Sequence, residues 1–440
     1  MPRCDVAVVG GGPADLLAAG LLARQGAAVT VFDRSEPSGQ RIGETLGAQV
    51  ATLLKAAGAW DAVAPLLEEQ PPYTVVRSAW GSPEPQVSEA FTRPLGVGWH
   101  IDRQRFDAGL AEWALTCGAV LRRGVGSCSI AAAGGGLAVV PHRGQPCWAD
   151  RVIDASGRGA PASHALPGWQ WVAVDRQVGL LASYAASELA DPEPSLLLEA
   201  VEHGFWYSAP QPGGKRIAVL VTDADVLQRL GPDPLQRLQA GLAASQWTAR
   251  RLAGRLLEGP PRVFRSDSGW LATDRGSSWR AVGDAAMATD PLGGNGIARA
   301  LQSALDLAKT PDAPSDLAAG QRAFAAYRQV RARYYWLEGR WPDAPFWARR
   351  RPLDAAGQPL YAAEVVLDLD PSAALALGSA LPAAAQAWLP LPALAVVAAL
   401  DQPVAAHQLI GALRAVAPIG DRALVVGVQW LLSTGALRQV

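Results

Sequence analysis

The N-terminal residues alternate short apolar runs with turn signals. Residues 5–9, an aspartate followed by four apolar residues, are mostly β-branched, which predicts a strand, and three glycines follow at 10–12. A helical apolar pattern over 16–25 comes next, and a second apolar run over 28–32 predicts a strand that ends at Asp33. This order is the fingerprint of a dinucleotide-binding unit: a strand, a glycine turn and a helix, then a second strand that ends in an acid about 20 residues further on.

Each position in this fingerprint has a physical role. Gly10 permits a tight turn, and Gly12 lets the backbone approach a pyrophosphate at the start of the helix. Asp33 is placed to bond the hydroxyls of an adenosine ribose. The predicted cofactor contacts of this unit are Gly10, Gly12, Pro13, Ala14, Asp33 and Arg34.

Asp15 departs from the fingerprint, because the third glycine is expected at this position. That glycine normally lets the helix pack closely on the strand. A carboxylate near the start of a helix suits the helix dipole. It also lies near the expected phosphates and adds bulk, so we expect Asp15 to weaken cofactor binding without abolishing it.

The C-terminal residues show a different pattern. Residues 391–400 form a helical apolar stripe, and a turn at 401–403 precedes a second predicted helix over 404–416. Asp421 is placed to cap a third helix that runs to about Ser433. Three short helices followed by 437–438 resemble a winged helix. The few arginines of this segment are matched by aspartates, so the pattern favours a protein contact or a packing domain and not nucleic-acid binding.

Composition narrows the class of protein. A chain of 440 residues is long enough for two or three domains. The 39 basic and 40 acidic residues leave a net charge of −1, which gives no general attraction to nucleic acid or to an anionic membrane. The four cysteines have no metal-ligand spacing, so no metal site is expected and the thiols are expected to be reduced.

No targeting or membrane segment is visible in the sequence. The most apolar late stretch, 388–400, is broken by Pro390 and Pro392 and is shorter than the roughly 20 residues that a bilayer requires. We therefore expect a soluble, cytoplasmic protein without a membrane partner.

Three further motifs occur downstream, and two arginines accompany them. The motifs are Ile153–Arg158, Val282–Ala286 and Asp290–Ile297, and the arginines are Arg41 and Arg103. In this order they resemble the motifs of FAD-dependent aromatic hydroxylases, flavin-dependent halogenases and their relatives. The resemblance covers about residues 5–300 and implies that the dinucleotide is FAD.

The resemblance assigns roles to these motifs. It implies that Asp284 holds a ribityl hydroxyl and that the helix start after Pro291 faces the N1–C2=O edge of the flavin, where backbone N–H groups stabilise negative charge. Neither flavin-facing motif contains a histidine or cysteine, so the FAD is expected to be non-covalent. The further cofactor contacts expected are Arg41, Arg103, Val125, Asp284, Pro291, Gly294, Asn295, Gly296 and Ile297.

The resemblance also implies a domain organisation. The fold class is α/β, with a Rossmann-like FAD-binding domain interrupted by a mostly antiparallel β-sheet substrate domain and followed by a small helical, winged-helix-like domain. The FAD-binding domain is expected to comprise 1–72, 97–165 and 265–325. The substrate domain is expected to comprise 73–96 and 166–264, and the C-terminal helical region 326–440.

Two departures argue against halogenation. The halogenase lysine should precede Trp80, yet no lysine lies between Lys55 and Lys215. The halogenase glutamate should fall near Gly293, which has no carboxyl group. The chemistry that remains is hydroxylation of an electron-rich ring through an FAD C4a-hydroperoxide.

Within this branch the chain resembles the flavoproteins that mature tryptophylquinone cofactors, such as the peptidyl-tryptophan dihydroxylases that serve quinohemoprotein amine dehydrogenase. The matching segments are Arg41–Glu44, Ser78–Gly81, Gly204–Pro210 and Arg340–Arg351. This resemblance implies that the substrate is a tryptophan side chain in a protein partner. The oxygen source would be O2, and the electron donor NAD(P)H or a partner reductase.

Two residues are candidates for acid–base chemistry. Glu44 follows Arg41 closely and is either a proton shuttle near the flavin or the partner of that arginine in a salt bridge. His100 is a second candidate, or else a core residue. Two other functions stay open: a hydroxylase or halogenase of a free small molecule, and a non-catalytic flavin-containing maturation or binding protein.

Overall fold

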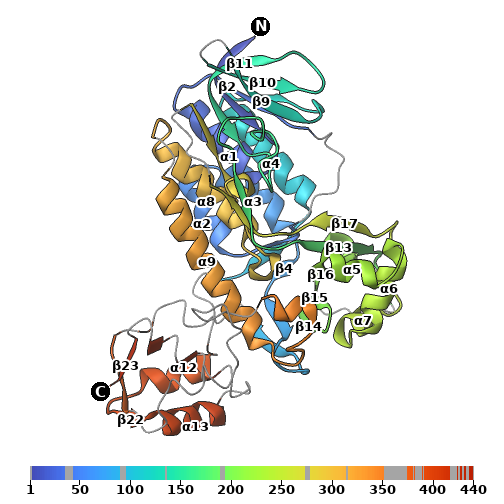
Figure 1. Cartoon of the computed structure of the whole chain (residues 1–440), viewed down its shortest axis with the longest axis vertical. Coiled ribbons are helices and arrows are strands. Elements are labelled where there is room, and N and C mark those ends of the chain that lie inside the picture. Colours follow the sequence, from blue (N-terminus) through green and yellow to red (C-terminus); the bar gives the residue numbers. More distant parts are fainter. Residues whose placement is uncertain are drawn as a thin grey trace.

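A computed structural model describes residues 2–34, 43–89, 96–133, 136–188, 194–272, 278–313, 316–350, 374–379, 381, 389, 391–416, 424, 427–428, 431–432 and 436–439. The chain is mixed α/β, with a first domain at the N-terminal end, a second domain beside it and a small C-terminal body at the opposite end (Figure 1).

The first domain is built on a seven-stranded sheet in the order β8-β2-β1-β11-β10-β9, with β19 beside the second half of β11. Its strands are β1 (Arg3–Val9), β2 (Val29–Phe32), β8 (Val120–Arg122), β9 (Cys128–Ala133), β10 (Gly136–Pro141), β11 (Cys147–Asp154) and β19 (Trp279–Ala281). β1 pairs in parallel with both β2 and β11. Parallel strands are covered on both faces, which explains why β2 is apolar or β-branched at every position and wholly buried.

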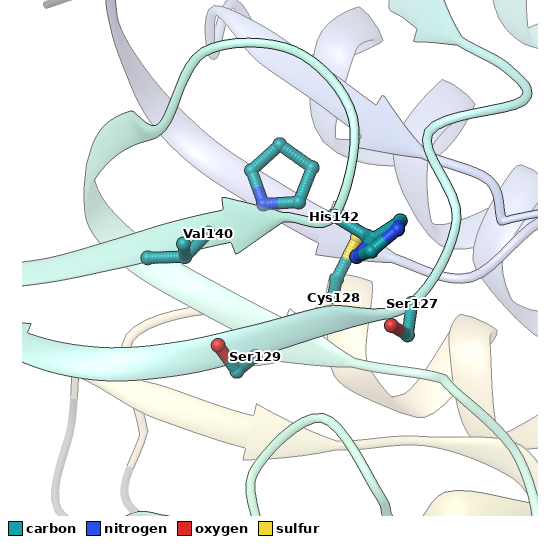
Figure 2. Close-up of a pocket in the computed structure, with 6 residues that line it drawn as sticks. Ser127, Cys128, Ser129, Val140 and His142 are labelled. Carbon is teal, nitrogen blue, oxygen red and sulfur yellow. The ribbon is translucent and has the colours of Figure 1, made fainter.

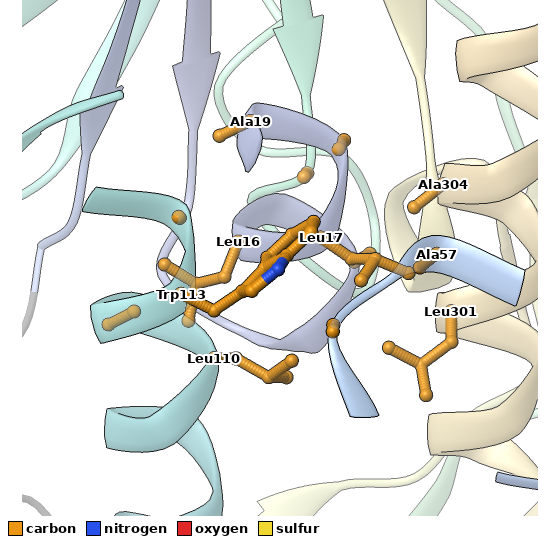
Figure 3. Close-up of a cluster of buried hydrophobic side chains, with 14 of the residues drawn as sticks. Leu16, Leu17, Ala19, Ala57, Leu110, Trp113, Leu301 and Ala304 are labelled. Carbon is orange, nitrogen blue, oxygen red and sulfur yellow. The ribbon is translucent and has the colours of Figure 1, made fainter. Parts of the chain in front are cut away.

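Helices cover one face of this sheet and form its main core. They are α1 (Pro13–Arg24), α2 (Gln49–Ala57), α3 (Trp60–Glu68), α4 (Arg103–Thr116) and α8 (Gly296–Lys309). Figure 3 shows Trp113 of α4 among Leu17 of α1, Ala57 of α2 and Leu301 of α8. A β-carbon at Gly20 would overlap the Trp113 ring, so α1 and α4 approach this closely only because residue 20 is glycine.

The second domain is a seven-stranded, mostly antiparallel sheet in the order β17-β13-β16-β15-β14-β5-β6. Its strands are β5 (Val75–Ala79), β6 (Gln86–Glu89), β13 (Gln177–Tyr184), β14 (Leu196–Val201), β15 (Gly204–Pro210), β16 (Arg216–Asp223) and β17 (Arg262–Arg265). One face packs against a group of three helices, α5 (Ala224–Arg229), α6 (Pro234–Ala243) and α7 (Trp247–Leu252). The other face packs against aromatic side chains from later in the chain.

Two small sheets join these domains. One has the order β12-β18-β20 and consists of β12 (Trp171–Ala173), β18 (Gly269–Leu271) and β20 (Met287–Ala288). The other has the order β3-β7-β4 and consists of β3 (Thr45–Leu46), β4 (Pro72–Tyr73) and β7 (Gly98–His100). The chain therefore passes between the two domains through paired strands.

The rest of the chain begins with α9 (Leu317–Leu337) and α10 (Pro345–Ala348). The C-terminal body contains α12 (Leu391–Ala398), α13 (Ala406–Val416), β21 (Ala374–Leu377), β22 (Val404–Ala405) and β23 (Leu437–Gln439). Its described apolar side chains pack in a cluster of their own.

This C-terminal body differs in part from its expected form. The two helices expected over 391–400 and 404–416 are present, but the first two residues of the second form β22. The region expected to be helical also carries a three-stranded sheet in the order β22-β21-β23. The helix expected from Asp421 to about Ser433 lies largely outside the described residues. Within the described part of the chain, no helix is long and apolar enough to cross a membrane.

Candidate active site

The glycine turn after β1 leads directly into α1. Gly10 has φ +139°, and a β-carbon there would lie 2.5 Å from the Ala155 carbonyl oxygen, so only glycine fits. Gly12 is the N-cap of α1, and Pro13 and Ala14 are its first residues. The fingerprint residues therefore surround a helix N-terminus, the position at which backbone N–H groups can bind a phosphate.

Asp15 belongs to this turn. The Gly12 N–H donates a hydrogen bond of 2.7 Å to Asp15 Oδ2, and the Asp15 side chain is buried. The carboxylate thus caps α1, which explains how a charged residue is accommodated at the position of the third glycine. One N–H of the phosphate-binding turn is consequently already bonded to an anion of the protein itself.

Asp33 directly follows β2, beside this turn. It is buried, and its carbonyl oxygen accepts a hydrogen bond of 3.2 Å from the Val125 N–H, while the neighbouring Arg34 is exposed. A cavity of about 50 Å³ lies between this strand end and α4. The residues that line it are Gly11, Leu16, Val31, Asp33, Gln104, Asp107, Ala108, Leu121 and Arg123.

This cavity contains side chains that the sequence motifs did not indicate, among them Gln104, Asp107 and Arg123. Gln104 and Asp107 lie on α4, and Arg123 follows β8. The fingerprint could not indicate them because their approach to Asp33 depends on how the helix packs on the sheet. A place beside Asp33 and the glycine turn is where a ribose would lie.

Two expected contacts, Arg103 and Ile297, come together beside Gly43. A β-carbon at Gly43 would lie 2.5 Å from Arg103 Nη1 and 3.2 Å from Ile297 Cδ1. Arg103 is held by a salt bridge of 3.1 Å to Asp107. Arg41, the other expected arginine, lies outside the described residues.

The second flavin motif forms a loop that ends at the start of α8. Asp284 accepts a salt bridge of 3.3 Å from Arg158, a residue of the middle motif. Gly294 is left-handed, with φ +59°, and a β-carbon at Gly294 or Gly296 would meet nothing within 4 Å. Asn295 accepts a hydrogen bond of 3.0 Å from Gln49. The glycine-rich helix start therefore borders open space.

Asp290 anchors this loop to the rest of the molecule through a short helical turn, η4 (Pro291–Gly293). Its Oδ2 accepts hydrogen bonds from Gln177 at 3.0 Å, Arg331 at 3.1 Å and Tyr335 at 2.5 Å. Burial opposes the charge of Asp290, but Arg331 and the Tyr335 hydrogen bond outweigh it and hold the pKa of the carboxyl below its usual range. The carboxylate thus fixes the loop against β13 and α9.

The described residues fit FAD. The glycine turn and the N-terminus of α1 suit a pyrophosphate, and the cavity beside Asp33 suits the ribose of the adenosine half. Asp284 is partly exposed beside the loop, where it can bond a ribityl hydroxyl. The open backbone at Gly294 and Gly296 leaves room for the edge of a flavin ring.

Glu44 lies where the two domains meet. It is 4% exposed, and among the described residues its Oε1 has no hydrogen-bond partner. Burial raises the pKa of this carboxyl, against the opposing effect of nearby backbone N–H groups, Arg103 and Arg262. Its charge in turn helps to raise the pKa of Tyr207 on β15, which burial already raises well above 10. A raised pKa favours the protonated form of this carboxyl group.

His100 is also buried at this junction, but its surroundings differ. Its Nδ1 lies 3.1 Å from Thr45 Oγ1, and its ring meets the Tyr73 ring edge-on at 5.3 Å. Burial, and then the charge of Arg216, lowers the pKa of His100 to about 4. The imidazole is therefore neutral at pH 7 and packs with core side chains, which makes Glu44 the better placed acid.

Tyr207 and Arg262 were not among the expected site residues. Cross-strand pairing places both on the sheet face that carries Leu181 and Val219, because 262 pairs with 181 and 207 pairs with 219. Trp206, the neighbour of Tyr207, is on the opposite face, since successive strand residues alternate in direction. Its Nε1 donates to the Gly241 carbonyl of α6 at 3.3 Å, and its ring is buried in the core beneath the helices of this domain.

An aromatic cluster covers the end of the same sheet face. Trp80 is at its centre, with ring centroids 5.6 Å from Phe205, 5.8 Å from Tyr335 and 5.2 Å from Trp347. Leu292 of the flavin loop packs against this cluster. The side chains of Phe205, Tyr335 and Trp347 are buried, so this part of the face is closed by the protein's own rings.

A separate open groove of about 260 Å³ lies on the hairpin of β9 and β10 (Figure 2). Cys128 and His142 line it together with Ser127, Ser129 and Val140. Burial, and then the charge of Asp33, raises the pKa of the Cys128 thiol to about 11, so the thiol is not a nucleophile at neutral pH. None of these residues belongs to the flavin motifs.

Comparison with known proteins supports the assignment of the cofactor. Residues 3–107 match the family described as FAD binding domain. The myxobacterial chondrochloren halogenase CndH has a similar fold, with a TM-score of 0.68 and 21% identity over 81% of this chain and 87% of its own. The flavin-dependent halogenase CmlS gives a TM-score of 0.70 with 18% identity, over 100% of this chain and 96% of its own.

The expected α/β fold and the resemblance to flavin-dependent hydroxylases and halogenases are therefore confirmed. The protein is an FAD-dependent oxidoreductase. One relative of known sequence is the protein LodB of Marinomonas mediterranea, whose name describes it as an FAD-dependent oxidoreductase. It is 27% identical over 369 residues, which cover 81% of this chain and 99% of that protein.

Proposed function

We propose that this oxidoreductase is a monooxygenase that hydroxylates the ring of a tryptophan side chain within another protein, during the biogenesis of a tryptophylquinone cofactor. The observation that carries the proposal is the buried carboxyl of Glu44, with Oε1 unpartnered among the described residues and with Tyr207 and Arg262 facing it from the second domain. Bound FAD would supply the reduction of O2 and the transfer of one oxygen atom.

The reaction needs a proton donor and a proton acceptor. An aromatic C–H, O2, two electrons and two protons give a C–OH and one water, with NAD(P)H or a partner reductase as the electron source. Glu44 in its protonated form would give a proton to the oxygen that leaves as water. As a carboxylate, it would then take the proton from the hydroxylated ring carbon.

One feature supports hydroxylation over halogenation, and a second supports a polypeptide substrate. Ala79, immediately before Trp80, is fully buried and provides no amino group, which separates the chain from a lysine-dependent halogenase. The aromatic cluster around Trp80 closes one end of the sheet face, whereas Arg262 at the other side of that face is exposed. A substrate would therefore approach from the Arg262 side, which is exposed to solvent.

The proposal is tested with Glu44→Gln. Hydroxylation, followed as oxygen atoms added to the mass of a tryptophan-containing polypeptide, should fall by about 10²–10⁴-fold. The absorbance of bound FAD and its reduction should stay unchanged. Full activity of the variant would remove Glu44 from the mechanism. NAD(P)H oxidation that is stimulated by free tryptophan or a simple phenol, with full coupling to product, would overturn the polypeptide substrate.

A further inference from the structure

β17 is the terminal strand of the second-domain sheet. Among the described residues it pairs with β13 alone, through Arg262, Val263, Phe264 and Arg265. Arg262 and Arg265 are exposed, and Val263 is 45% exposed. The strand therefore presents a solvent-exposed edge beside the candidate active site.

The hydrogen-bond pattern determines which backbone groups point outward from this edge. The Ser266 N–H donates to the Gln177 carbonyl at 3.0 Å, so residue 266 faces β13. Antiparallel pairing alternates, so residues 264 and 262 also face β13, whereas Val263 and Arg265 direct their N–H and C=O groups away from it. An extended peptide could pair with these outward groups as an added strand.

The position of the edge connects it to Glu44. Arg262 lies on the sheet face of Leu181 and Tyr207, and its charge acts on the Glu44 carboxyl. A strand added beside β17 would lie about 4.8 Å further out. Every second side chain of that strand would then project onto the same face, next to Arg262 and towards Glu44.

The charge of β17 indicates what kind of segment it would accept. The strand contains two arginines and no acidic residue, and Asp267 just beyond it forms a salt bridge of 2.7 Å to Arg265. We infer that the outer edge of β17 holds an extended, acidic segment of the substrate protein and thereby presents its tryptophan to the flavin. This inference rests on the proposed function, because it specifies how a polypeptide substrate is held.

The test uses a short fluorescent peptide of alternating glutamate and threonine with one central tryptophan. Its affinity for the FAD-loaded protein is measured by fluorescence anisotropy. A matched peptide with N-methyl groups on alternate amides cannot donate to the edge, and it should bind about tenfold more weakly, as expected for the loss of one or two hydrogen bonds. Replacing glutamate by lysine should also weaken binding.

A pair of protein variants provides the second measurement. Val263→Pro removes an outward N–H without touching the bonds to β13, and should weaken peptide binding about tenfold. Val87→Pro places a proline at a solvent-exposed position of β6, the other edge strand, and should leave peptide affinity within about twofold. Bound-FAD absorbance checks that both variants are folded.

Equal binding of the methylated peptide, or equal effects of the two variants, would overturn the β17 assignment. These outcomes can be distinguished from a failure of the proposed function. If the peptide binds with the expected dependences but its tryptophan never gains oxygen, the proposed reaction is wrong and the edge assignment stands. If tryptophan is hydroxylated while neither change alters KM, the edge assignment is wrong and the reaction stands.

Discussion

At the scale of single residues, Asp15 has two opposing effects. Its carboxylate caps α1 through the Gly12 N–H, and it places negative charge where a pyrophosphate would bind. We predict that Asp15→Gly binds FAD more tightly and loses less of it on dialysis, because the charge and one competing acceptor are removed. The apoprotein should be less stable by about 1 kcal/mol, since a capping bond is lost.

The matched control is Asp15→Asn, which keeps a side-chain acceptor for Gly12 and removes the charge. FAD affinity is measured by fluorescence titration and stability by thermal unfolding of the apoprotein. If Asp15→Gly binds FAD equally or more weakly, the carboxylate supports the cofactor in some other way.

His100 predicts a pH dependence of stability. Its pKa is about 4 in the folded protein, below the ordinary value of 6.5, so the unfolded chain binds more protons between these values. The free energy of unfolding should therefore rise with pH from about 4 to 6.5 and then level off, with His100 contributing up to about 3 kcal/mol.

Denaturant unfolding across this pH range measures the effect, with His100→Gln for comparison. The glutamine variant should lack this part of the pH dependence, because glutamine does not titrate. If the free energy of unfolding depends on pH in the same way in both proteins, then His100 is protonated in the folded state or is accessible to water there.

The sequence could predict the site residues whose roles depend on local backbone geometry. Gly10, Gly12 and Asp33 lie at the turn, the helix start and the strand end that their spacing indicates. Tyr207 and Arg262 could not be predicted in this way. Their approach to Glu44 depends on the register of two strand pairs and on how one domain packs against the other.

At the scale of elements, the buried end of β5 leaves no solvent-exposed place for a lysine side chain at position 79. Ala79 is fully buried at the end of β5, and its carbonyl accepts a hydrogen bond of 3.1 Å from Arg340. We predict that Ala79→Lys gives no brominated indole with bromide, reductant and O2. The variant should instead be destabilised by several kcal/mol, because an unpaired charge is buried beside another cation.

Thermal unfolding measures this cost. Val87→Lys on the neighbouring strand β6 places the same side chain at a half-exposed position and should change stability by less than about 0.5 kcal/mol. Brominated product from the wild-type chain would show that the position of the missing lysine was misassigned. Brominated product from Ala79→Lys alone would show that a lysine at position 79 is not buried away from the reaction.

The sequence pattern predicted some helices and strands better than others. The helix over 16–25 was found as α1, which starts three residues earlier because Pro13 occupies its first position. The three helices α5–α7 were not expected within the sheet-rich second domain. They are short and partly buried, and their apolar positions are hard to distinguish from those of strands.

At the scale of the whole molecule, the C-terminal body can be separated from the flavin site. Its described apolar residues pack with one another, and none of them belongs to the clusters around the flavin motifs. We predict that deleting the residues after Asp370 leaves FAD binding and flavin reduction nearly unchanged. Activity on a polypeptide substrate should fall more, because we expect this body to contact the protein substrate.

Stopped-flow flavin reduction and the mass of the hydroxylated polypeptide measure the two properties separately. Equal loss of both would show that the C-terminal body supports the cofactor domain. Full activity on the polypeptide would show that it takes no part in holding the substrate.

The division of the first domain along the chain also affects how the protein is made. β19 pairs with β11, and α8 packs against α1, although these partners come from opposite ends of the domain's sequence. A ribosome synthesises the glycine turn early and the loop at 291–296 much later, after the entire second domain. The nascent chain therefore cannot complete its flavin site until the loop at 291–296 has been synthesised.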